Sequence, residues 1–583
     1  MSYHSLDKKS QQTSLSGYPR NYDARRRAKE PRWLRWRVLV VAAITLLWFI
    51  VHYRSRIAFG DVLQSRLVNT PPVFSWDKIT PSQRLEYHPC YQDFQCARLE
   101  VPMDWQRNDT KGKTVALAIV RLPAKVPVTD ARYAGPVLTN PGGPGGSGVE
   151  QILRAGKMTQ YIVDADMTPN TTSSTDRDND TRRYHDIISW DPRSIGFSTP
   201  NVQCFPDSLS RETWLMQNEA IGLLGSSEDS WLRNWYRAKA LASGCSVANG
   251  ETLDGSEAFA QHVNTVAVVR DMLEIIDRHA DWVEQERERL LFVQDKRPNG
   301  VVHVKNASQD IVKLKYWGNS YGTLIGQTFS SLYPDRVGRL VLDGVVDAEQ
   351  YYFGPWFANL QDSDKILSRF FEHCFDAGPD RCSYYNAAGA DAIRQEYESL
   401  LTHIFDHPIG VPCTSSRGPD VITWSDVKST VRLGMYMPIA FFPIIAELLA
   451  DVGRGNGSLM ADFKQSMGGS GLSCPSPTCK AAGPYTPACN AAGTTDYDAS
   501  LAILCSDIDA TFADVNETGF QMYWHKLQGQ SKVLGDWWAH TRLGCVGWKV
   551  KPKWQFEGPV GGRTEEGILF VNPSLDPVTP LEK

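Results

Sequence analysis

The sequence has no excess of basic residues. Lys and Arg number 61 against 66 Asp and Glu, giving a formal net charge of -5, whereas a domain that binds nucleic acid generally carries a basic patch and a basic overall charge. There is also no Cys-x-x-Cys pair and no cluster of Cys and His at the spacing of a zinc site, which argues against a bound metal. We therefore expect no nucleic-acid partner, no metal and no cofactor.

Long hydrophobic runs are scarce too, and the clearest one lies near the N-terminus. Residues 38–53, VLVVAAITLLWFIVHY, carry no charge, and residues 1–37 before them form a basic polar tail with ten Lys and Arg against three acids. The run is at the short end for a spanning helix, but the basic residues that precede it predict a single-pass type II membrane anchor with a cytoplasmic N-terminus. The alternative is a cleaved signal peptide and a secreted protein.

Two features of the remaining chain agree with a lumenal or extracellular location. All 12 cysteines follow the hydrophobic run, and an oxidising compartment would pair most of them as disulfides. Cys90–Cys96, Cys204–Cys245 and Cys374–Cys382 are candidate pairs of neighbouring cysteines, although the sequence alone leaves the connectivity open. Sequons for N-linked glycosylation lie at Asn108, Asn170, Asn179, Asn306, Asn456 and Asn516.

The stretch with the clearest chemistry is residues 316–323, YWGNSYGT. The apolar residues 311–317 predict a strand, and residues 324–333 predict a helix that ends before a proline. Gly318-x-Ser320-x-Gly322 between a strand and a helix is the pattern of a nucleophile elbow, a sharp turn that lifts a serine hydroxyl off the edge of a sheet. The five-residue pattern alone is common, but in this setting a catalytic serine is favoured over a structural turn.

A glycine-rich loop, residues 140–148 (NPGGPGGSG), follows a predicted strand at residues 136–139. A flexible connector is one interpretation of such a loop, although connectors are usually mixtures of Gly and Ser. The position of this loop, after a strand and before a helix, is where α/β-hydrolases place a backbone N–H that binds an oxyanion. We favour this second interpretation.

The predicted elements alternate along the chain. Further strands are expected at residues 114–121, 184–190, 338–343 and 567–572, the last of them buried, and a helix at residues 262–276. This alternation predicts an α/β fold with a mostly parallel sheet and helices on both faces. Asp191 and Arg193 follow the strand at residues 184–190, where catalytic residues can lie, but we favour an ion pair between them that braces their loop. Asp343 ends the strand at residues 338–343, a position that some α/β-hydrolases use for the catalytic acid, but we expect it to be structural.

The alternation stops between residues 350 and 560. Helices are predicted there at residues 364–375 and 424–452, next to a stretch rich in Gly, Ser, Pro and Cys. We interpret this region as an inserted, largely helical, disulfide-bonded cap over the active site. The predicted organisation is a basic tail (1–37), an anchor (38–53), a stem (54–87), the first part of the core (88–349), the cap (350–560) and a return to the core (561–583).

Several motifs, in order along the chain, resemble those of one family. NPGGPGGSG, WDPRSIGFS, GNSYGT, RLVLDGVVD, the ILCSD around Cys505 and the closing LDPVTP resemble the tripeptidyl-aminopeptidase-like (TAP-like) serine hydrolases, relatives of the prolyl aminopeptidases with the α/β-hydrolase fold. The resemblance runs from about Cys90 to the end of the chain. It implies that Ser320 is the nucleophile, that Asp576 is the acid of the catalytic triad, and that the N–H groups of Gly143 and Tyr321 bind the oxyanion.

The sequence departs from that family at the triad histidine. The family carries this residue in a Gly-His loop beyond the acid, after the last strand of the fold, and both would fall beyond Lys583. The histidines between the elbow and the end of the chain all lie in the predicted cap, at His373, His403, His407, His525 and His540. A histidine of the cap is one alternative for the base, but we expect the triad histidine beyond Lys583, because the motifs before that point are intact. Without it the protein would keep only the residual catalysis of binding and of the oxyanion hole.

The resemblance implies an exopeptidase. Such an enzyme would release single residues or short peptides from the N-termini of peptides, through an acyl-enzyme on Ser320. One alternative is an esterase or amidase that acts on small metabolites with the same residues. Another is a catalytically inactive hydrolase fold that serves as a binding protein, which would apply if the chain truly ended at Lys583.

Overall fold

The computed structural model describes residues 74–107, 112–166, 169, 181–249, 258–294, 311–467, 476–483, 486, 488–489 and 496–582. The chain divides into Met1–Phe74 and Ser75–Lys583, and the fold is that of the second part. The predicted anchor at residues 38–53 lies outside the described residues and stays a prediction. Within the described ranges, no helix is both long and apolar enough to cross a membrane.

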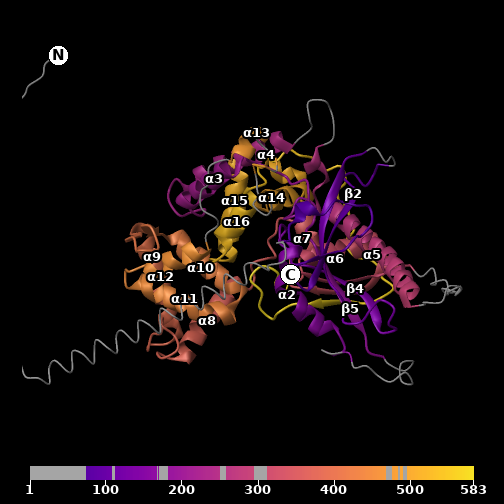
Figure 1. Ribbon diagram of the computed structural model, residues 1–583. Coiled ribbons are helices and arrows are strands. Elements are labelled where there is room, and N and C mark those ends of the chain that lie inside the picture. The colour runs from indigo at the N-terminus through magenta and orange to yellow at the C-terminus, as the bar shows by residue number, and fades with distance from the viewer. Residues whose placement is uncertain are drawn as a thin grey trace, which may run out of the picture. The chain divides into compact units, whose positions relative to one another are not determined.

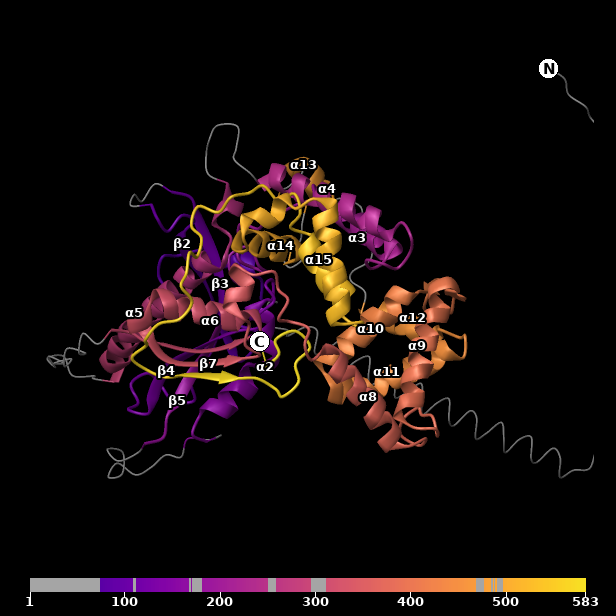
Figure 2. The ribbon, with the colours of Figure 1, turned by 180° about the vertical axis from the view of Figure 1, so that it is seen from behind.

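An eight-stranded sheet forms the centre of the described fold, in the order β1-β2-β3-β5-β4-β6-β7-β10 (Figures 1 and 2). Strands β5, β4, β6, β7 and β10 are parallel to one another, whereas β1, β2 and β3 are antiparallel to their neighbours. The strands are β1 (His88–Cys90), β2 (Phe94–Pro102), β3 (Thr114–Leu122), β4 (Tyr133–Asn140), β5 (Tyr184–Trp190), β6 (Leu314–Asn319), β7 (Val337–Asp343) and β10 (Ile568–Val571). Each strand predicted from the sequence is present, and the mostly parallel sheet confirms the expected α/β class.

The strand order brings the two predicted site motifs together. β4 pairs in parallel with β6, with Asn140 opposite Gly318. Because parallel strands end at the same edge of a sheet, the glycine-rich loop after β4 and the elbow after β6 emerge side by side at the carboxyl edge.

Helices cover both faces of the sheet, as expected. On one face Gly148, at the start of α2, lies so close to β5 that an added Cβ would be 2.5 Å from Ser189 Oγ. On the other face His279 Nε2, in α5, lies 3.2 Å from Asp186 Oδ2. Ser189 and Asp186 are three positions apart on β5, so their side chains point to opposite faces. The main helices against the sheet are α2 (Gly148–Val163), α5 (Thr265–Gln294) and α6 (Tyr321–Leu332).

The loop after β5 corrects one expectation, because Asp191 and Arg193 do not pair with each other. Asp191 accepts hydrogen bonds from Ser147 Oγ (2.6 Å) and Val149 N (3.0 Å), which fixes the start of α2. The buried Arg193 forms its ion pair with Asp271 of α5, at 2.6 Å. The two residues are structural, but they brace the loop against two different helices.

The chain between β7 and β10 forms a helical cap with one small hairpin. The hairpin strands are β8 (Ile409–Val411) and β9 (Asp420–Ile422). The helices are α7 (Ala348–Tyr352), α8 (Ser363–Ala377), α9 (Ala390–Asp406), α10 (Trp424–Tyr436), α11 (Pro438–Gly453), α12 (Ser458–Met467), α13 (Pro477–Ala482), α14 (Asp496–Asp507), α15 (Glu517–Gln530) and α16 (Gly535–Leu543).

The single helix predicted at residues 424–452 is wrong, because α10 and α11 are separate helices. Met437 between them has φ -137° and ψ 65°, which is outside the helical region. A residue that precedes proline is disfavoured in the helical conformation, so Pro438 ends α10 and begins α11 as its first residue.

Two helices from an earlier section of the chain, α3 (Ser208–Ile221) and α4 (Ser230–Asn249), pack against the cap (Figures 1 and 2). Trp231 of α4 stacks on Phe520 and Trp524 of α15, with ring centroids 5.8 Å apart in both pairs. The cap is therefore assembled from two sections of chain that are separated by α5, β6, α6 and β7.

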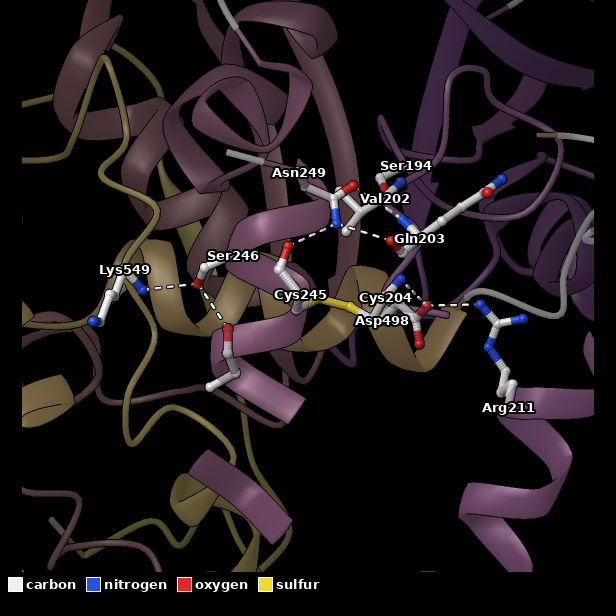
Figure 3. The surroundings of a disulfide bond; sticks show 11 residues. Ser194, Val202, Gln203, Cys204, Arg211, Cys245, Ser246, Asn249, Asp498 and Lys549 are labelled. Atoms are coloured by element: carbon white, nitrogen blue, oxygen red, sulfur yellow. Dashed lines mark hydrogen bonds and ion pairs between the residues drawn. A yellow bond between two sulfur atoms is a disulfide. The ribbon is translucent and has the colours of Figure 1, made fainter. Parts of the chain in front are cut away.

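The disulfide Cys204–Cys245 fastens α4 to the loop after β5 (Figure 3). Beside it, Asp498 of α14 accepts a hydrogen bond from the Cys204 N–H (2.8 Å) and pairs with Arg211 of α3 (2.7 Å). The three predicted disulfides are confirmed, and the structure adds two more within the cap. The disulfides are Cys90–Cys96, Cys204–Cys245, Cys374–Cys382, Cys479–Cys489 and Cys505–Cys545.

The last strand, β10, is not buried as the sequence predicted. Leu569 and Phe570 are 58% and 55% exposed. β10 pairs with β7 on one side, and no other strand of the described residues pairs with its outer edge. The apolar sequence of β10 predicts a strand that is covered on both sides. Among the described residues, however, β10 is the edge strand of the sheet and its outer side is unpaired.

Candidate active site

Ser320 is the turn residue between β6 and α6. Its φ of +52° and ψ of -123° place it in a region that residues with side chains rarely adopt. The Ser320 N–H donates to Asp343 O (2.9 Å), and the Thr323 N–H donates to Ser320 O (2.8 Å). Such strain persists only where the surroundings enforce it, and it is concentrated at functional sites. The sharp turn predicted from the motif is present.

The glycines on either side of Ser320 are required by close backbone contacts. A Cβ on Gly318 would lie 2.4 Å from the carbonyl oxygen of Gly322, and a Cβ on Gly322 would lie 2.8 Å from that of Asn140. Real Cβ atoms do not approach other atoms so closely, so only glycine lets β6 turn into α6 beside the end of β4.

The glycine-rich loop lies directly against this elbow. Its Gly142 has φ +94°, and a Cβ there would be 2.9 Å from both Ser320 Cβ and Tyr321 N. Asn140 Oδ1 accepts a hydrogen bond from the Gly142 N–H (2.9 Å), which holds the loop in place. Gly143, the next residue, is exposed toward the cavity at Ser320.

A cavity of about 150 Å³ opens at Ser320, Gly143 and Tyr321. Most of the described lining residues lie between β7 and β10, and the bulkiest side chains among them are aromatic. Among the described lining residues, Asp347 provides the sole carboxylate; its Oδ1 accepts the N–H of Gln350 (3.0 Å) at the start of α7. The other lining residues are Pro144, Val346, Tyr351, Trp356, Asn359, Tyr436, Leu504, Trp537, Trp538, Thr541, Val578 and Thr579.

The loop that carries Asp576 reaches this cavity, but the Asp576 carboxylate does not line it. Asp576 Oδ1 accepts hydrogen bonds from the N–H groups of Val578 (3.0 Å) and Thr579 (2.6 Å), which both line the cavity. Asp576 itself lines a neighbouring cavity of about 530 Å³, together with His373. The Asp576 carboxylate therefore fixes the conformation of the loop that lines the cavity, through hydrogen bonds to its backbone, without lining the cavity itself.

No histidine within the described ranges lines the cavity at Ser320, and no described residue forms a hydrogen bond with the Ser320 hydroxyl. Asp343, the alternative acid at the end of β7, accepts a hydrogen bond from Asn319 Nδ2 (3.4 Å) and takes the Ser320 N–H on its carbonyl. Both contacts are those of a residue that holds the elbow in shape.

Two of the predicted glycosylation sites fall within the described residues. Asn456 and Asn516 are both exposed, and the Asn516 side chain also caps α15 by accepting the Gly519 N–H (2.8 Å). The other four, Asn108, Asn170, Asn179 and Asn306, lie outside the described residues. Glycosylation at all six positions stays a prediction.

The aromatic wall and Asp347 are the parts of the site that were not identified from the sequence. Asp347 ends the motif RLVLDGVVD, and Trp537 and Trp538 are adjacent in the chain. The acidic residue and the pair of tryptophans can both be seen in the sequence. Their sequence neighbours, however, do not indicate that these segments meet at Ser320.

With this geometry in place, the chain can be compared with known proteins. A family model described as TAP-like protein matches residues 531–583. Serine protease Hip1 of Mycobacterium tuberculosis is 25% identical over 345 residues, which cover 59% of this chain and 53% of that protein. Tripeptidyl aminopeptidase of Streptomyces lividans is 27% identical over 317 residues, which cover 54% of this chain and 47% of that protein.

A shorter match joins residues of the chain to carboxylesterase B of M. tuberculosis, at 30% identity over 179 residues, or 30% of this chain and 28% of that protein. The chain spans about half the length of the first curated relatives it matches. The mostly parallel sheet and the serine elbow against a glycine-rich loop are those of an α/β-hydrolase. The matches confirm the resemblance of this chain to the TAP-like serine hydrolases.

Proposed function

We propose that this protein is a serine hydrolase that removes single residues or short peptides from the N-termini of peptides. The observation that carries the proposal is the strained Ser320 turn, which lies against the glycine-rich loop at the mouth of an aromatic cavity. The relatives named as a serine protease and a tripeptidyl aminopeptidase support a peptide substrate.

In the proposed reaction, Ser320 Oγ gives its proton to a general base and attacks the carbonyl carbon of the scissile amide. The C–N bond then breaks, the leaving amine takes up that proton, and an acyl-enzyme remains. Water hydrolyses the acyl-enzyme, which releases the N-terminal residue or short peptide and restores the Ser320 hydroxyl. The N–H groups of Gly143 and Tyr321 stabilise the oxyanion of the tetrahedral intermediate. Each preorganised donor of this kind lowers the barrier by about 3 kcal/mol. Both residues line the same cavity as Ser320, which is the placement that this role requires.

Asp347 supports an aminopeptidase in particular. A free N-terminal amine is a cation at neutral pH, and a single carboxylate among Trp and Tyr rings favours a cation, since the faces of aromatic rings attract positive charge as well. Trp356, Trp537 and Trp538 supply such rings around the cavity. We propose that Asp347 holds the amine of the substrate.

For the base, the histidine expected beyond Lys583 stays a prediction, and Asp576 is proposed as its acid. Asp576 Oδ1 is used by its own loop. No described residue donates a hydrogen bond to Asp576 Oδ2, so that oxygen could accept the imidazole N–H of such a histidine.

The nucleophile is tested with a fluorophosphonate probe. We expect the active enzyme to be labelled at one residue, and labelling to be lost in Ser320→Ala but kept in Ser331→Ala, which changes a control serine in α6, the helix that follows Ser320. Residues 1–583 should be compared, with and without added imidazole, with a chain extended along its reading frame. If the extended chain is not labelled either, the inactive binding protein becomes the better description.

The substrate class is tested with arylamides of single amino acids and tripeptides, the same compounds N-acetylated, and short-chain esters. We expect the free-amine arylamides to be preferred, and Asp347→Asn to lower kcat/KM for them by about 10-fold or more, because hydrogen bonds to charged groups are worth about 1.5–3 kcal/mol. Asn keeps the cap of α7, so this variant removes only the charge. Faster hydrolysis of esters, unaffected by this change, would indicate the esterase instead.

A further inference from the structure

A buried carboxylate joins the cap to the serine elbow. Asp507, the last residue of α14, is 2% exposed. Its Oδ1 accepts the Thr265 N–H (2.9 Å), and its Oδ2 accepts the Thr265 hydroxyl (2.6 Å). The Thr265 Oγ1 lies 2.5 Å from the hydroxyl of Tyr321, the residue directly after Ser320.

These contacts link three parts of the fold that are far apart in sequence. Asp507 belongs to the cap, Thr265 begins α5 of the core, and Tyr321 begins α6. Thr265, Tyr321 and Asp507 are all buried. Because Asp507 takes the hydroxyl hydrogen of Thr265, Thr265 Oγ1 is left to accept the phenol hydrogen of Tyr321, and the bonds run in one direction toward the carboxylate.

The position of Asp507 is itself tightly fixed. Cys505, two residues earlier, is joined to Cys545 just after α16. The side-chain amide of Gln555 donates to the carbonyl of Asp507 (3.2 Å). Because the backbone of Asp507 is fixed in this way, its carboxylate can fix the positions of the groups that donate hydrogen bonds to it.

Asp507 is also placed beside the cavity without lining it. Tyr351, which does line the cavity, donates from its hydroxyl to Asp507 Oδ2 (3.2 Å). The residue therefore does not touch a bound substrate, and its influence on the reaction must pass through its neighbours.

We propose that Asp507 is a positioning residue that, through Thr265, fixes Tyr321 and its backbone N–H, one of the two donors to the oxyanion. The cap would then contribute to catalysis in two ways: it would enclose the substrate, and the packing of α14 against the core would fix the position of Tyr321. This inference rests on the proposed hydrolase function, because it needs Tyr321 N–H to face the reacting carbonyl.

The test compares Thr265→Val with Thr265→Ser. Valine has nearly the shape of threonine but lacks the hydroxyl, whereas serine keeps it. On the preferred arylamide, we expect Thr265→Val and Asp507→Asn to lower kcat by about 10-fold to 100-fold with little change in KM, since small displacements of a catalytic group have effects of this size. Thr265→Ser should retain kcat within about twofold of the wild type, because its hydroxyl preserves the link between Tyr321 and Asp507.

The control for a merely structural effect is Asp451→Asn, which changes another buried carboxylate of the cap, in α11, without contact to the elbow. It should leave kcat unchanged even if thermal stability falls. Hydrogen exchange at the Tyr321 amide gives a second measurement, and it should quicken in Thr265→Val but not in Thr265→Ser or Asp451→Asn.

The outcomes separate this inference from the function on which it rests. A wild-type enzyme that shows no turnover and no labelling of Ser320 overturns the proposed function, and the inference with it. An active wild type whose kcat and Tyr321 exchange are unchanged in both Thr265→Val and Asp507→Asn overturns the inference alone.

Discussion

The carboxyl group of Asp507 should make the stability of this protein depend on pH. Burial, the largest cause, raises the pKa of Asp507 from 3.8 to about 7, although hydrogen bonds from Thr265 and Tyr351 oppose the shift. No cation of the described residues forms an ion pair with this carboxylate. The folded protein therefore holds the Asp507 proton more tightly than the unfolded chain does.

The size of the effect follows from that shift. One pKa unit corresponds to about 1.4 kcal/mol, so a rise from 3.8 to about 7 corresponds to about 4 kcal/mol. Because the folded pKa is raised, this stabilisation is complete below the unfolded pKa, near pH 4, and is lost as the pH rises through about 7. Asp507→Asn has no proton to lose, so its stability lacks this dependence.

The assay is denaturant unfolding of the wild type and Asp507→Asn, with disulfides intact, at several pH values between 4 and 8.5. The free energy of unfolding of the wild type, minus that of the variant, should fall by about 4 kcal/mol across this range. Other titrating groups affect both proteins and cancel in the difference. A difference that stays constant within about 1 kcal/mol would refute the reasoning, since the carboxyl would then be in the same state folded and unfolded.

Three further predictions concern other parts of the structure. Gly142→Ala places a Cβ 2.4 Å from Asn319 O, so we expect labelling of the nucleophile to slow by about 100-fold while circular dichroism stays unchanged. Arg193→Leu leaves the buried Asp271 without its ion pair, and it should lower the free energy of unfolding by about 3–5 kcal/mol, measured by denaturant titration. Replacing Cys505 and Cys545 by serine should lower the free energy of unfolding by about 2–4 kcal/mol, measured as a lower Tm. Reductant should then lower the Tm of this variant by less than it lowers that of the wild type.

The fold could be predicted largely because its signals are local. A buried parallel strand such as β5 appears in the sequence as a short apolar run, and its predicted range, residues 184–190, is the observed one. The elbow was likewise predictable, because its Gly-x-Ser-x-Gly pattern lies within five residues, and a Cβ on Gly318 would meet the carbonyl oxygen of Gly322 in the same turn. The hydrophobic periodicity of a strand and the glycines that a strained turn requires both appear within a few neighbouring residues of the sequence.

The remainder depended on contacts between distant segments. The cavity wall brings Trp356, Tyr436 and Trp537 together, and the sequence around an aromatic residue does not indicate which surface that residue will face. The ion pair of Arg193 was assigned to the wrong partner for the same reason, since Asp271 is 78 residues away. The exposure of β10 could not be predicted, because composition indicates a strand but not what covers it.

The two-part assembly of the cap sets an order of events during synthesis. Arg211 of α3 and its partner Asp498 are 287 residues apart, and a ribosome adds about 5–20 residues per second. Helices α3 and α4 therefore emerge about 15 to 60 s before α14 and α15 exist to receive them. During that interval Trp231 and Trp235, which later contact Phe520, have no native partner in α15, and a chaperone that shields them would raise the yield of correctly folded protein.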